Sequence, residues 1–440
     1  MTEKALSAGI FTLGCKVNQY ESEAIAEELT RRGFSVFFDR EGCDVSVVNT
    51  CTVTAESDRK CRQLIRRLIK AAPDSYVIVT GCLAQTAPDS LTKIDGVSFV
   101  CGNSKKMAAA DAAERYARGL NADTSVTEVD DIMSAPFEPM TITKFERTRA
   151  YVKIEDGCEN RCSYCIIPSA RGRVRSKPPA EVIDEVKKLI DGGCREIVLT
   201  GIETASYGRD LEGCDLADLL RMVDSLGCNR IRLGSLDPSL IKDKFVARIA
   251  QLSSLTPHFH LSLQSGSDRI LARMRRKYNS KMAMDCIDRL RDALPGVMFT
   301  TDVIVGFPGE TEEDHAATAE FLRRARFLSA HIFQYSPRKG TEAAEMSDQI
   351  PSDVKSRRSA ELIALQNGIR REILEEQATI GAEHQVLFET YSKGLAVGHT
   401  TSFIEVAVKS PVPLHSEIRR VRIVGVENDG KSMRCIGTVL

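Results

Sequence analysis

The sequence predicts an α/β protein with a doubly wound parallel sheet, a central partial (β/α)6 barrel and a small all-β barrel at the carboxyl end. Two stretches of the chain alternate apolar β-rich runs with amphipathic helical runs, and a last stretch holds short β-rich runs separated by Gly, Pro and Ser. Strands that are apolar throughout and alternate with helices are typical of parallel sheets covered on both faces. A chain of 440 residues is also too long for one ordinary core.

The first alternating stretch predicts a doubly wound domain over residues 1–117. The expected elements are strands at 8–14, 45–50, 76–81 and 97–100 and helices at 18–34 and 57–71. After them the alternation stops, and Pro136 and Pro139 interrupt the chain. We therefore predict a linker over residues 118–143.

A second alternating stretch predicts the partial barrel over residues 144–375. The expected strands are 151–154, 196–201, 230–235, 258–263, 297–306 and 329–336, and the expected helices include 179–191, 311–326 and 352–377. Six βα units are enough for an incomplete barrel, and such barrels carry their sites at the carboxyl ends of the strands.

The remaining residues, 376–440, change in character. They contain the short runs VLFET, GLAVGHT, FIEVAV, EIRRVRIVGVEN and CIGTVL. Short strands separated by turn residues favour a small closed barrel.

Composition narrows the class of protein. Charged residues make up 28% of the chain and hydrophobic residues 42%, which is typical of a soluble globular protein. No apolar run approaches the ~20 residues of a membrane span, and the first residues lack the zones of a secretory signal. We therefore expect a cytoplasmic protein. The net charge of −1 neither favours nor excludes a nucleic-acid partner, so local basic runs must decide that question.

Three of the fourteen cysteines, Cys158, Cys162 and Cys165, follow the first barrel strand within eight residues, and we call them the barrel trio. In a reducing compartment, such cysteines indicate metal or redox chemistry rather than disulfides. Three thiolates can hold three irons of a cubane cluster and leave the fourth iron open to a reacting molecule. A zinc knuckle is the alternative, but no fourth Cys or His lies nearby to complete it.

A second set of cysteines follows three strands of the first domain, and we call Cys15, Cys51 and Cys82 the sheet trio. The carboxyl ends of parallel strands meet at one edge of a sheet, so these thiols are expected to converge on a second cluster. Small buried cysteines also favour strand ends, and Cys101 follows a strand in the same way, either as a fourth ligand or as packing. The other cysteines are interpreted as structural: Cys43, Cys61, Cys194, Cys214, Cys228, Cys286 and Cys435.

The spacing of the barrel trio at the mouth of a partial barrel resembles the radical S-adenosylmethionine superfamily. Further segments resemble one family within it, the methylthiotransferases, across the whole chain and in the family's order. In the first domain these segments are TLGCKVNQYESE, VVNTCTVT and VTGCLAQ. In the barrel they are DGCENRCSYCIIPSARGRVRS, LTGIETASYG, LSLQSGSD and TDVIVGFPGETEED. The carboxyl-terminal region resembles the family's TRAM domain, an RNA-binding barrel related to OB-folds.

This resemblance implies two 4Fe–4S clusters and S-adenosylmethionine as cofactors. The barrel trio would hold the cluster that cleaves S-adenosylmethionine to a carbon radical, and the sheet trio would ligate an auxiliary cluster that holds a sulfur. The family replaces a C–H bond with C–SCH3, and one S-adenosylmethionine methylates the sulfur while a second supplies the radical. A catalytic role for Cys158, Cys162 and Cys165 follows from the resemblance.

Other side chains are candidates for binding the cofactor. Gly306, Pro308 and Gly309 form a turn after a strand, which would suit close approach by an adenine or ribose or simply connect a strand to a helix. Gln264, Ser265 and Arg276 match polar positions of the family's motifs, although each could instead satisfy local backbone groups.

Basic runs favour RNA as a partner, and by resemblance the partner is the anticodon loop of tRNA. They comprise Arg59, Lys60, Arg62, Arg66, Arg67 and Lys70; Arg171, Arg173, Arg175 and Lys177; and Arg419, Arg420 and Arg422, with Tyr391, His399 and Phe403 as stacking candidates. Any single run is more often a solvated face. We also expect an electron donor such as a flavodoxin or ferredoxin, and no membrane.

The first motif, TLGCKVNQYESE, resembles the bacterial branch that acts on N6-threonylcarbamoyladenosine at tRNA position 37. The expected product is its 2-methylthio derivative. Two alternatives stay open: the same chemistry on isopentenyladenosine or on a ribosomal-protein aspartate, and a non-enzymatic, RNA-binding carrier of electrons with two clusters.

Overall fold

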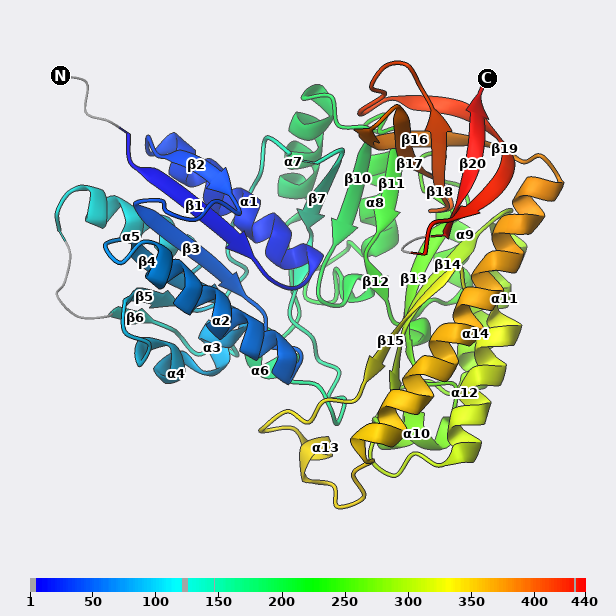
Figure 1. The fold of residues 1–440 in the computed structure, drawn as a ribbon, viewed down its shortest axis with the longest axis horizontal. Coiled ribbons are helices and arrows are strands. Elements are labelled where there is room, and N and C mark those ends of the chain that lie inside the picture. The colour runs from blue at the N-terminus through cyan, green and yellow to red at the C-terminus, as the bar shows by residue number, and fades with distance from the viewer. Residues whose placement is uncertain (1–4, 121–125, 146, 431–432) are drawn as a thin grey trace.

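The computed structural model describes residues 5–120, 126–145, 147–430 and 433–440. Figure 1 shows three parts: the amino-terminal sheet domain in blue and cyan, the open barrel in green and yellow, and the small barrel in orange and red. The predicted α/β class and all three architectures are confirmed. Of the expected linker, residues 121–125 lie outside the described residues.

The amino-terminal sheet has six parallel strands in the order β2-β1-β3-β4-β5-β6. Its strands are β1 (Ser7–Thr12), β2 (Ser35–Phe38), β3 (Val45–Thr50), β4 (Tyr76–Gly81), β5 (Val97–Cys101) and β6 (Val126–Glu128). Its helices are α1 (Lys16–Arg31), α2 (Ala55–Ala71), α3 (Cys82–Thr86), α4 (Pro88–Thr92) and α5 (Ala108–Ala117). The apolar sides of α1 and α5 cover one face, and those of α2, α3 and α4 cover the other. The sheet is therefore doubly wound.

Two edge strands depart from the sequence prediction. No strand was expected at β2, and β6 lies within the segment predicted as a linker, where it pairs with β5. With four and three residues, these strands are too short to show a periodic pattern. The expected linker thus adds a strand to the first sheet.

The central part is an open barrel of parallel strands. They form one sheet of β7 (Arg149–Lys153), β10 (Glu196–Thr200) and β11 (Arg230–Leu233), and another of β12 (Ser235–Leu236), β13 (His258–Gln264), β14 (Met298–Val305) and β15 (Ser329–Gln334). An isolated parallel bridge pairs Ile231 of β11 with Leu255, in the segment that leads into β13. The short strands β8 (Glu155–Asp156) and β9 (Arg175–Ser176) pair with each other. The six predicted strands are therefore present, the third of them split into β11 and β12.

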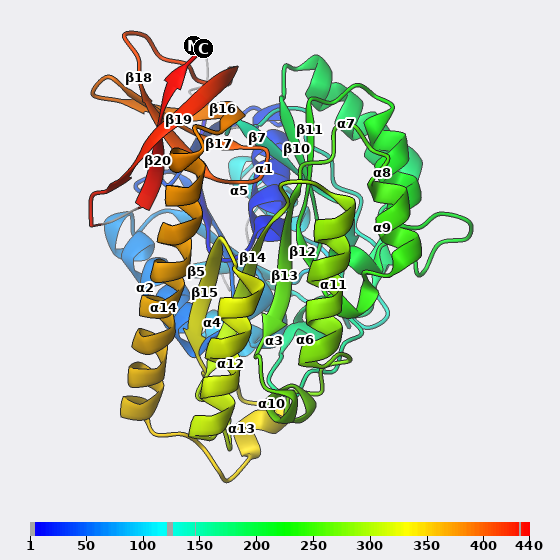
Figure 2. The same ribbon diagram turned by 90° about the vertical axis from the view of Figure 1, so that its right-hand side faces the viewer.

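Helices cover the outside of this barrel. Those that connect successive strands are α6 (Ile167–Arg171), α7 (Pro179–Asp191), η1 (Thr204–Ser206), α8 (Leu216–Asp224), η2 (Pro238–Leu240), α9 (Asp243–Ile249), α10 (Asp268–Arg273), α11 (Ser280–Ala293) and α12 (Glu312–Ala325). The short helix α13 (Glu342–Glu345) follows β15. The long helix α14 (Ser352–Thr379) runs beside β15 and α12, as Figure 2 shows, and leads into the last domain. None of the helices described is long and apolar enough to cross a membrane.

The carboxyl-terminal strands close into a five-stranded barrel. They are β16 (Glu383–Ser392), β17 (Leu395–Thr400), β18 (Glu405–Lys409), β19 (Ile418–Asn428) and β20 (Met433–Val439), in the order β16-β17-β18-β20-β19. Closure leaves no free sheet edge.

Phe403 connects this small barrel to the central one. Its ring stacks on His258 at 4.5 Å and on His399 at 4.7 Å, and the guanidiniums of Arg149 and Arg232 lie over it. The sequence prediction of His399 and Phe403 as RNA-stacking residues is therefore wrong, because both rings are used between domains.

We expect Phe403→Ala to lower the free energy of unfolding by about 2 kcal/mol, because it removes half-buried ring contacts and leaves a void between the barrels. Urea unfolding followed by circular dichroism measures this loss. Phe333→Ala, at a ring that is 47% exposed, is the control and should cost less than about 0.5 kcal/mol. Equal losses in the two variants would contradict the role given to Phe403.

Candidate functional site

The barrel trio lies on a loop that β8 and β9 close at its base. The amide of Cys158 donates to the carbonyl of Gly172 at 3.0 Å, and the amide of Cys165 donates to the carbonyl of Cys162 at 3.0 Å. Gly157 has a φ of 92°, and a Cβ there would lie 1.8 Å from the carbonyl oxygen of Arg173. Only glycine fits at this position, so the sequence just before Cys158 sets the path of the loop.

The thiols of the barrel trio act on one another electrostatically. Burial raises the pKa of Cys158 to about 12, with Glu203, Cys165 and Cys162 adding to the effect. Burial likewise raises the pKa of Cys165 to about 12, with a contribution from Cys162. The structure therefore brings the three predicted thiols together, beside the carboxyl ends of the barrel strands.

An arginine just after α10 supports the barrel trio. Arg276 donates from Nη1 to the sulfur of Cys162 at 3.2 Å, and its Nη2 pairs with Asp237 at 2.7 Å. The side chain also donates to the carbonyl of Ser262 at the end of β13. Arg276, predicted to bind the cofactor, thus contacts a trio sulfur directly.

The sheet trio also converges, as the strand order predicted. Cys15 follows β1, Cys51 follows β3, and Cys82 begins α3 directly after β4. Burial raises the pKa of Cys51 to about 11, and Cys82 and Cys15 raise it further. A Cβ on Gly14, which has a φ of 109°, would lie 3.1 Å from the sulfur of Cys51. Gly14 therefore allows the loop of Cys15 to approach Cys51 closely.

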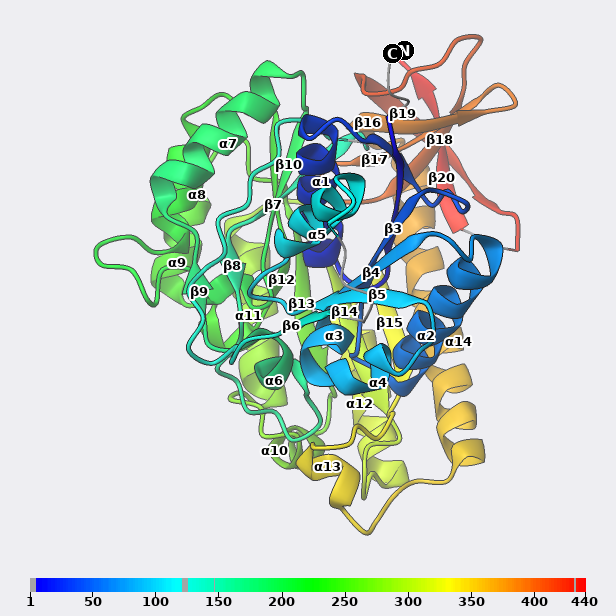
Figure 3. The same cartoon turned by 90° about the vertical axis from the view of Figure 1, so that its left-hand side faces the viewer.

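Arg171 connects the loop that carries the barrel trio to the sheet trio. It lies six residues beyond Cys165, is fully buried, and donates from Nε to the sulfur of Cys82 at 3.3 Å. Asn103 approaches the same sulfur at 3.6 Å and donates to the carbonyl of Ala170, next to Arg171. Figure 3 shows α3, which begins with Cys82, side by side with α6, which ends with Arg171. The loop of the barrel trio thus packs directly against the sheet trio.

A buried ionic network holds Arg171 in place. Its guanidinium pairs with Glu21 at 2.5 Å and with Asp156 at 3.3 Å. Glu21 also accepts from Lys106 at 2.8 Å and from Lys153 at 3.0 Å. Burial opposes the charge on Glu21, but the three cations outweigh burial and hold its pKa well below the ordinary value. Residues of both domains therefore fix the position of one cation beside Cys82.

Both trios suit an iron–sulfur cluster. Each offers three thiols from converging positions, and each has one arginine N–H directed at a sulfur, which stabilises thiolate charge. Within the described ranges, no three His, Cys, Asp or Glu side chains are grouped to share one metal ion. A cubane, in contrast, spreads its thiolates over separate irons.

Cys101, at the end of β5, is a residue of the hydrophobic core. Its side chain is fully buried in the main core, and the groups that act on it are Thr80, Lys106, Glu138 and Glu128. Burial raises the pKa of this thiol to about 12. Of the cysteines interpreted as structural, Cys61 donates its thiol to the carbonyl of Cys51 at 3.3 Å and so contacts the loop of the sheet trio.

The predicted turn at Gly306, Pro308 and Gly309 packs against two other segments of the chain. A Cβ on Gly306 would lie 2.3 Å from Cγ of Lys355, and one on Gly309 would lie 2.3 Å from a carboxylate oxygen of Asp348. Close packing against two neighbouring segments therefore explains both glycines, and their contact with a cofactor stays a prediction.

Gln264 and Ser265 end strand β13. The hydroxyl of Ser265 is buried and lies 3.3 Å from the hydroxyl of Thr318. Gln264 has a φ of 67°, which costs a non-glycine residue on the order of 1 kcal/mol. Such strain gathers at functional sites, and this supports the prediction for Gln264 more than that for Ser265.

The basic runs differ in exposure. On α2, the charged ends of Arg59, Lys60, Arg66, Arg67 and Lys70 are exposed, and so are Arg419, Arg420 and Arg422 on β19. The prediction that the run after the barrel trio faces RNA is wrong for three of its four residues. Arg171, Arg175 and Lys177 are buried, and only Arg173 is exposed. Lys177 pairs with Glu185 at 2.5 Å inside the protein. Spacing alone cannot distinguish a basic face from charges that are paired in the interior.

Comparisons with known proteins agree with this geometry. Residues 152–322 match the Radical SAM superfamily, and residues 7–102 match the Uncharacterized protein family UPF0004. Among solved structures, the radical S-adenosylmethionine methyltransferase TsrM from Kitasatospora setae has a TM-score of 0.57 at 15% identity, covering 90% of this chain and 77% of its own. That likeness shows the fold.

Curated relatives match nearly the whole chain. Threonylcarbamoyladenosine tRNA methylthiotransferase MtaB of Bacillus subtilis (strain 168) is 39% identical, covering 97% of this chain and 96% of its own. The protein of the same name from Thermotoga maritima is 38% identical, covering 90% of each chain. The tRNA-2-methylthio-N(6)-dimethylallyladenosine synthase of Acidothermus cellulolyticus is 39% identical, covering 86% of this chain and 76% of its own.

The fold and the cysteine loop at the barrel mouth define a radical S-adenosylmethionine enzyme. Within that class, the chain belongs to the tRNA methylthiotransferase family. Its cofactors are S-adenosylmethionine and 4Fe–4S clusters. The non-enzymatic electron carrier is therefore set aside.

Proposed function

We propose that this protein converts N6-threonylcarbamoyladenosine at position 37 of tRNA to its 2-methylthio derivative. The observation that carries the proposal is the hydrogen bond from Arg171, six residues beyond the barrel trio, to Cys82 of the sheet trio, which joins the two cysteine-bearing loops of different domains. Two such sites meet a requirement of the reaction, because a carbon radical and a sulfur donor must act on the same carbon atom. The full-length relatives named for this substrate support the choice of base.

In this proposal, Cys158, Cys162 and Cys165 hold one 4Fe–4S cluster, and Cys15, Cys51 and Cys82 hold the other. When bound, the two clusters and S-adenosylmethionine supply the radical, the sulfur and the methyl group. Arg276 and Arg171 each direct an N–H at one thiolate and so fix its orientation. The packing of α6 on α3 holds the two loops in one relative position, as a reaction between bound groups requires.

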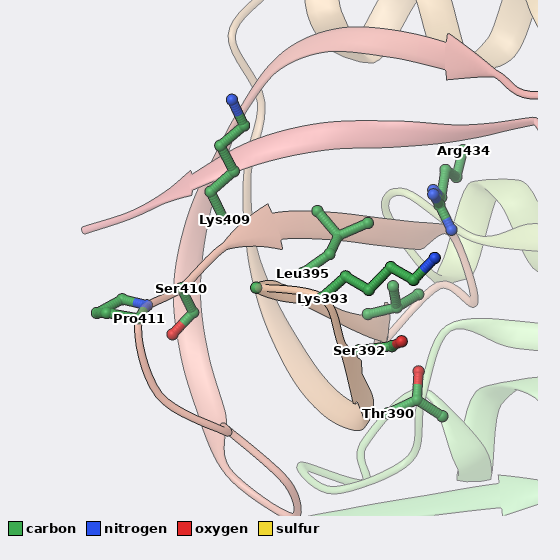
Figure 4. A pocket seen from close by; sticks show the side chains of 10 residues that line it. Thr390, Ser392, Lys393, Leu395, Lys409, Ser410, Pro411 and Arg434 are labelled. Carbon is green, nitrogen blue, oxygen red and sulfur yellow. The ribbon is translucent and has the colours of Figure 1, made fainter.

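The exposed basic surfaces suit an anticodon stem-loop. Helix α2 starts just after Cys51 and presents Arg59 and Lys60 in its first half, whereas Arg66 and Arg67 are exposed towards its other end. The carboxyl-terminal barrel has a pocket of about 700 Å3 lined by Lys393, Lys409 and Arg434, together with hydroxyl and backbone groups. Figure 4 shows Lys393 and Arg434 extending along this pocket. Phosphates would bind both surfaces. Reduction by a flavodoxin or ferredoxin and a cytoplasmic location complete the proposal.

The modified-nucleoside profile of tRNA tests the function. In cells that lack the gene, we expect 2-methylthio-N6-threonylcarbamoyladenosine to be absent and its unmethylthiolated precursor to accumulate, since the proposed reaction converts the one to the other. Mass spectrometry of digested tRNA measures both species. Loss of the dimethylallyladenosine derivative instead would favour the substrate of the other matched relatives, and an unchanged profile would contradict the proposed function.

A further inference from the structure

Lys16 is an unpartnered cation beside the sheet trio. It follows Cys15 directly and begins α1. Its side chain is exposed, and it makes no hydrogen bond or ion pair with any residue in the described part of the chain. The charged groups that act on it all belong to the barrel: Arg232 and Arg149 repel it, and Glu196 and Asp302 attract it. Lys16 therefore contacts solvent where the sheet domain faces the barrel.

Positively charged side chains outnumber carboxylates around Lys16. Arg149, Arg230 and Arg232 share one buried carboxylate, that of Glu196, at 3.8, 3.5 and 2.7 Å. Arg149 has a second partner in Glu389 at 2.6 Å. Asp302, the other carboxylate that acts on Lys16, is held between His260 at 3.3 Å and His331 at 3.0 Å.

Arg232 has capacity for one more acceptor. It is 1% exposed, and its Nη1 is buried with no hydrogen-bond partner among the described residues. Its Nε and Nη2 are used by Glu196 and by the carbonyl of Thr401. Of all charges, that of Arg232 acts most strongly on Lys16, and it is repulsive. Two neighbouring cations with free donors favour the entry of an anion between them.

We propose that Lys16, supported by Arg232, binds the carboxylate of the threonylcarbamoyl group on the substrate base. This inference rests on the proposed function. In adenine, C2 and C6 flank N1, so a substituent on N6 extends along the same edge that carries the reacting carbon. A base whose C2 faces Cys15 would therefore direct its N6 substituent toward the adjacent Lys16. A dimethylallyl group has no charge for these cations, which makes Lys16 a specificity-determining residue.

Binding of three anticodon stem-loop RNAs to the reconstituted protein tests this proposal. The RNAs carry N6-threonylcarbamoyladenosine, its methyl ester, or plain adenosine at position 37. We expect wild-type protein to bind the acid at least about tenfold more tightly than the ester, because the ester lacks the charge. Lys16→Gln should bind acid and ester equally, whereas Lys16→Arg should keep most of the preference.

Lys281→Gln is the matched control, because Lys281 lies on α11 with a side chain that is 79% exposed. It should bind all three RNAs as wild type does. Fluorescence anisotropy measures the affinities, and iron content verifies that each variant holds its clusters. Equal wild-type affinity for acid and ester would overturn the proposal without any variant. A Lys16→Gln variant that weakens all three RNAs alike would assign Lys16 to a phosphate and overturn it too.

Failure of this inference is distinguishable from failure of the proposed function. Product formation by wild-type protein on the threonylcarbamoyl RNA is measured in the same samples by mass spectrometry. If wild-type protein forms product but binds the acid and the ester RNAs equally, the proposed function stands and recognition of the carboxylate by Lys16 is rejected. An absence of product on that RNA would reject the function itself.

Discussion

Cys82→Ala is expected to abolish methylthiolated product while cleavage of S-adenosylmethionine to 5′-deoxyadenosine continues. Cys82 is the member of the sheet trio that Arg171 contacts, so its loss removes a ligand and leaves the buried guanidinium without its sulfur acceptor. The barrel trio keeps all three thiols and its contact with Arg276. Anaerobic assays with tRNA, in which product and deoxyadenosine are both quantified, measure the two activities separately.

Cys101→Ala is the matched control for this variant. Cys82 and Cys101 are both buried, and they lie at the ends of the neighbouring strands β4 and β5. Since Cys101 packs in the core, its replacement should keep the iron content and most of the product. A Cys82→Ala protein that still made product would refute the separate roles of the two trios.

Arg171→Leu is expected to lower the free energy of unfolding of the cluster-free protein by about 3–5 kcal/mol. The change removes the cation shared by Glu21 and Asp156, both fully buried, and leaves their charges less compensated. Urea unfolding of wild type and variant measures the loss. Because Arg171 spans both domains, the variant should also bind less iron at the sheet trio.

Arg173→Leu provides the comparison, because Arg173 is two residues away and exposed. Its replacement should change stability by less than about 0.5 kcal/mol. Similar losses from the two substitutions would show that the network around Arg171 contributes little beyond local packing.

The strands and both trios could be predicted because their signals are local or follow from topology. Uniformly apolar runs indicate parallel strands, and cysteines that directly follow such strands must meet at one sheet edge. The edge strands β2 and β6 could not be predicted, because pairing with a neighbour, rather than periodicity, defines a strand of three or four residues.

The contacts between domains were beyond sequence reasoning. Arg171 and Lys177 were interpreted as an RNA-binding run, since no local pattern shows that Glu21 and Glu185 lie opposite them. Phe403 was assigned to RNA for the same reason. One signal was present but unused: Lys153 lies within the otherwise apolar predicted strand 151–154, and a charge there requires a buried partner, which is Glu21.

Iron content after anaerobic reconstitution shows whether each of the two trios holds a cluster. Two clusters require about eight irons per wild-type chain, and about four in a variant with either trio replaced by alanine. We expect each triple variant to lose only its own cluster. About four irons in the wild type, or complete loss of iron on replacing one trio, would contradict it.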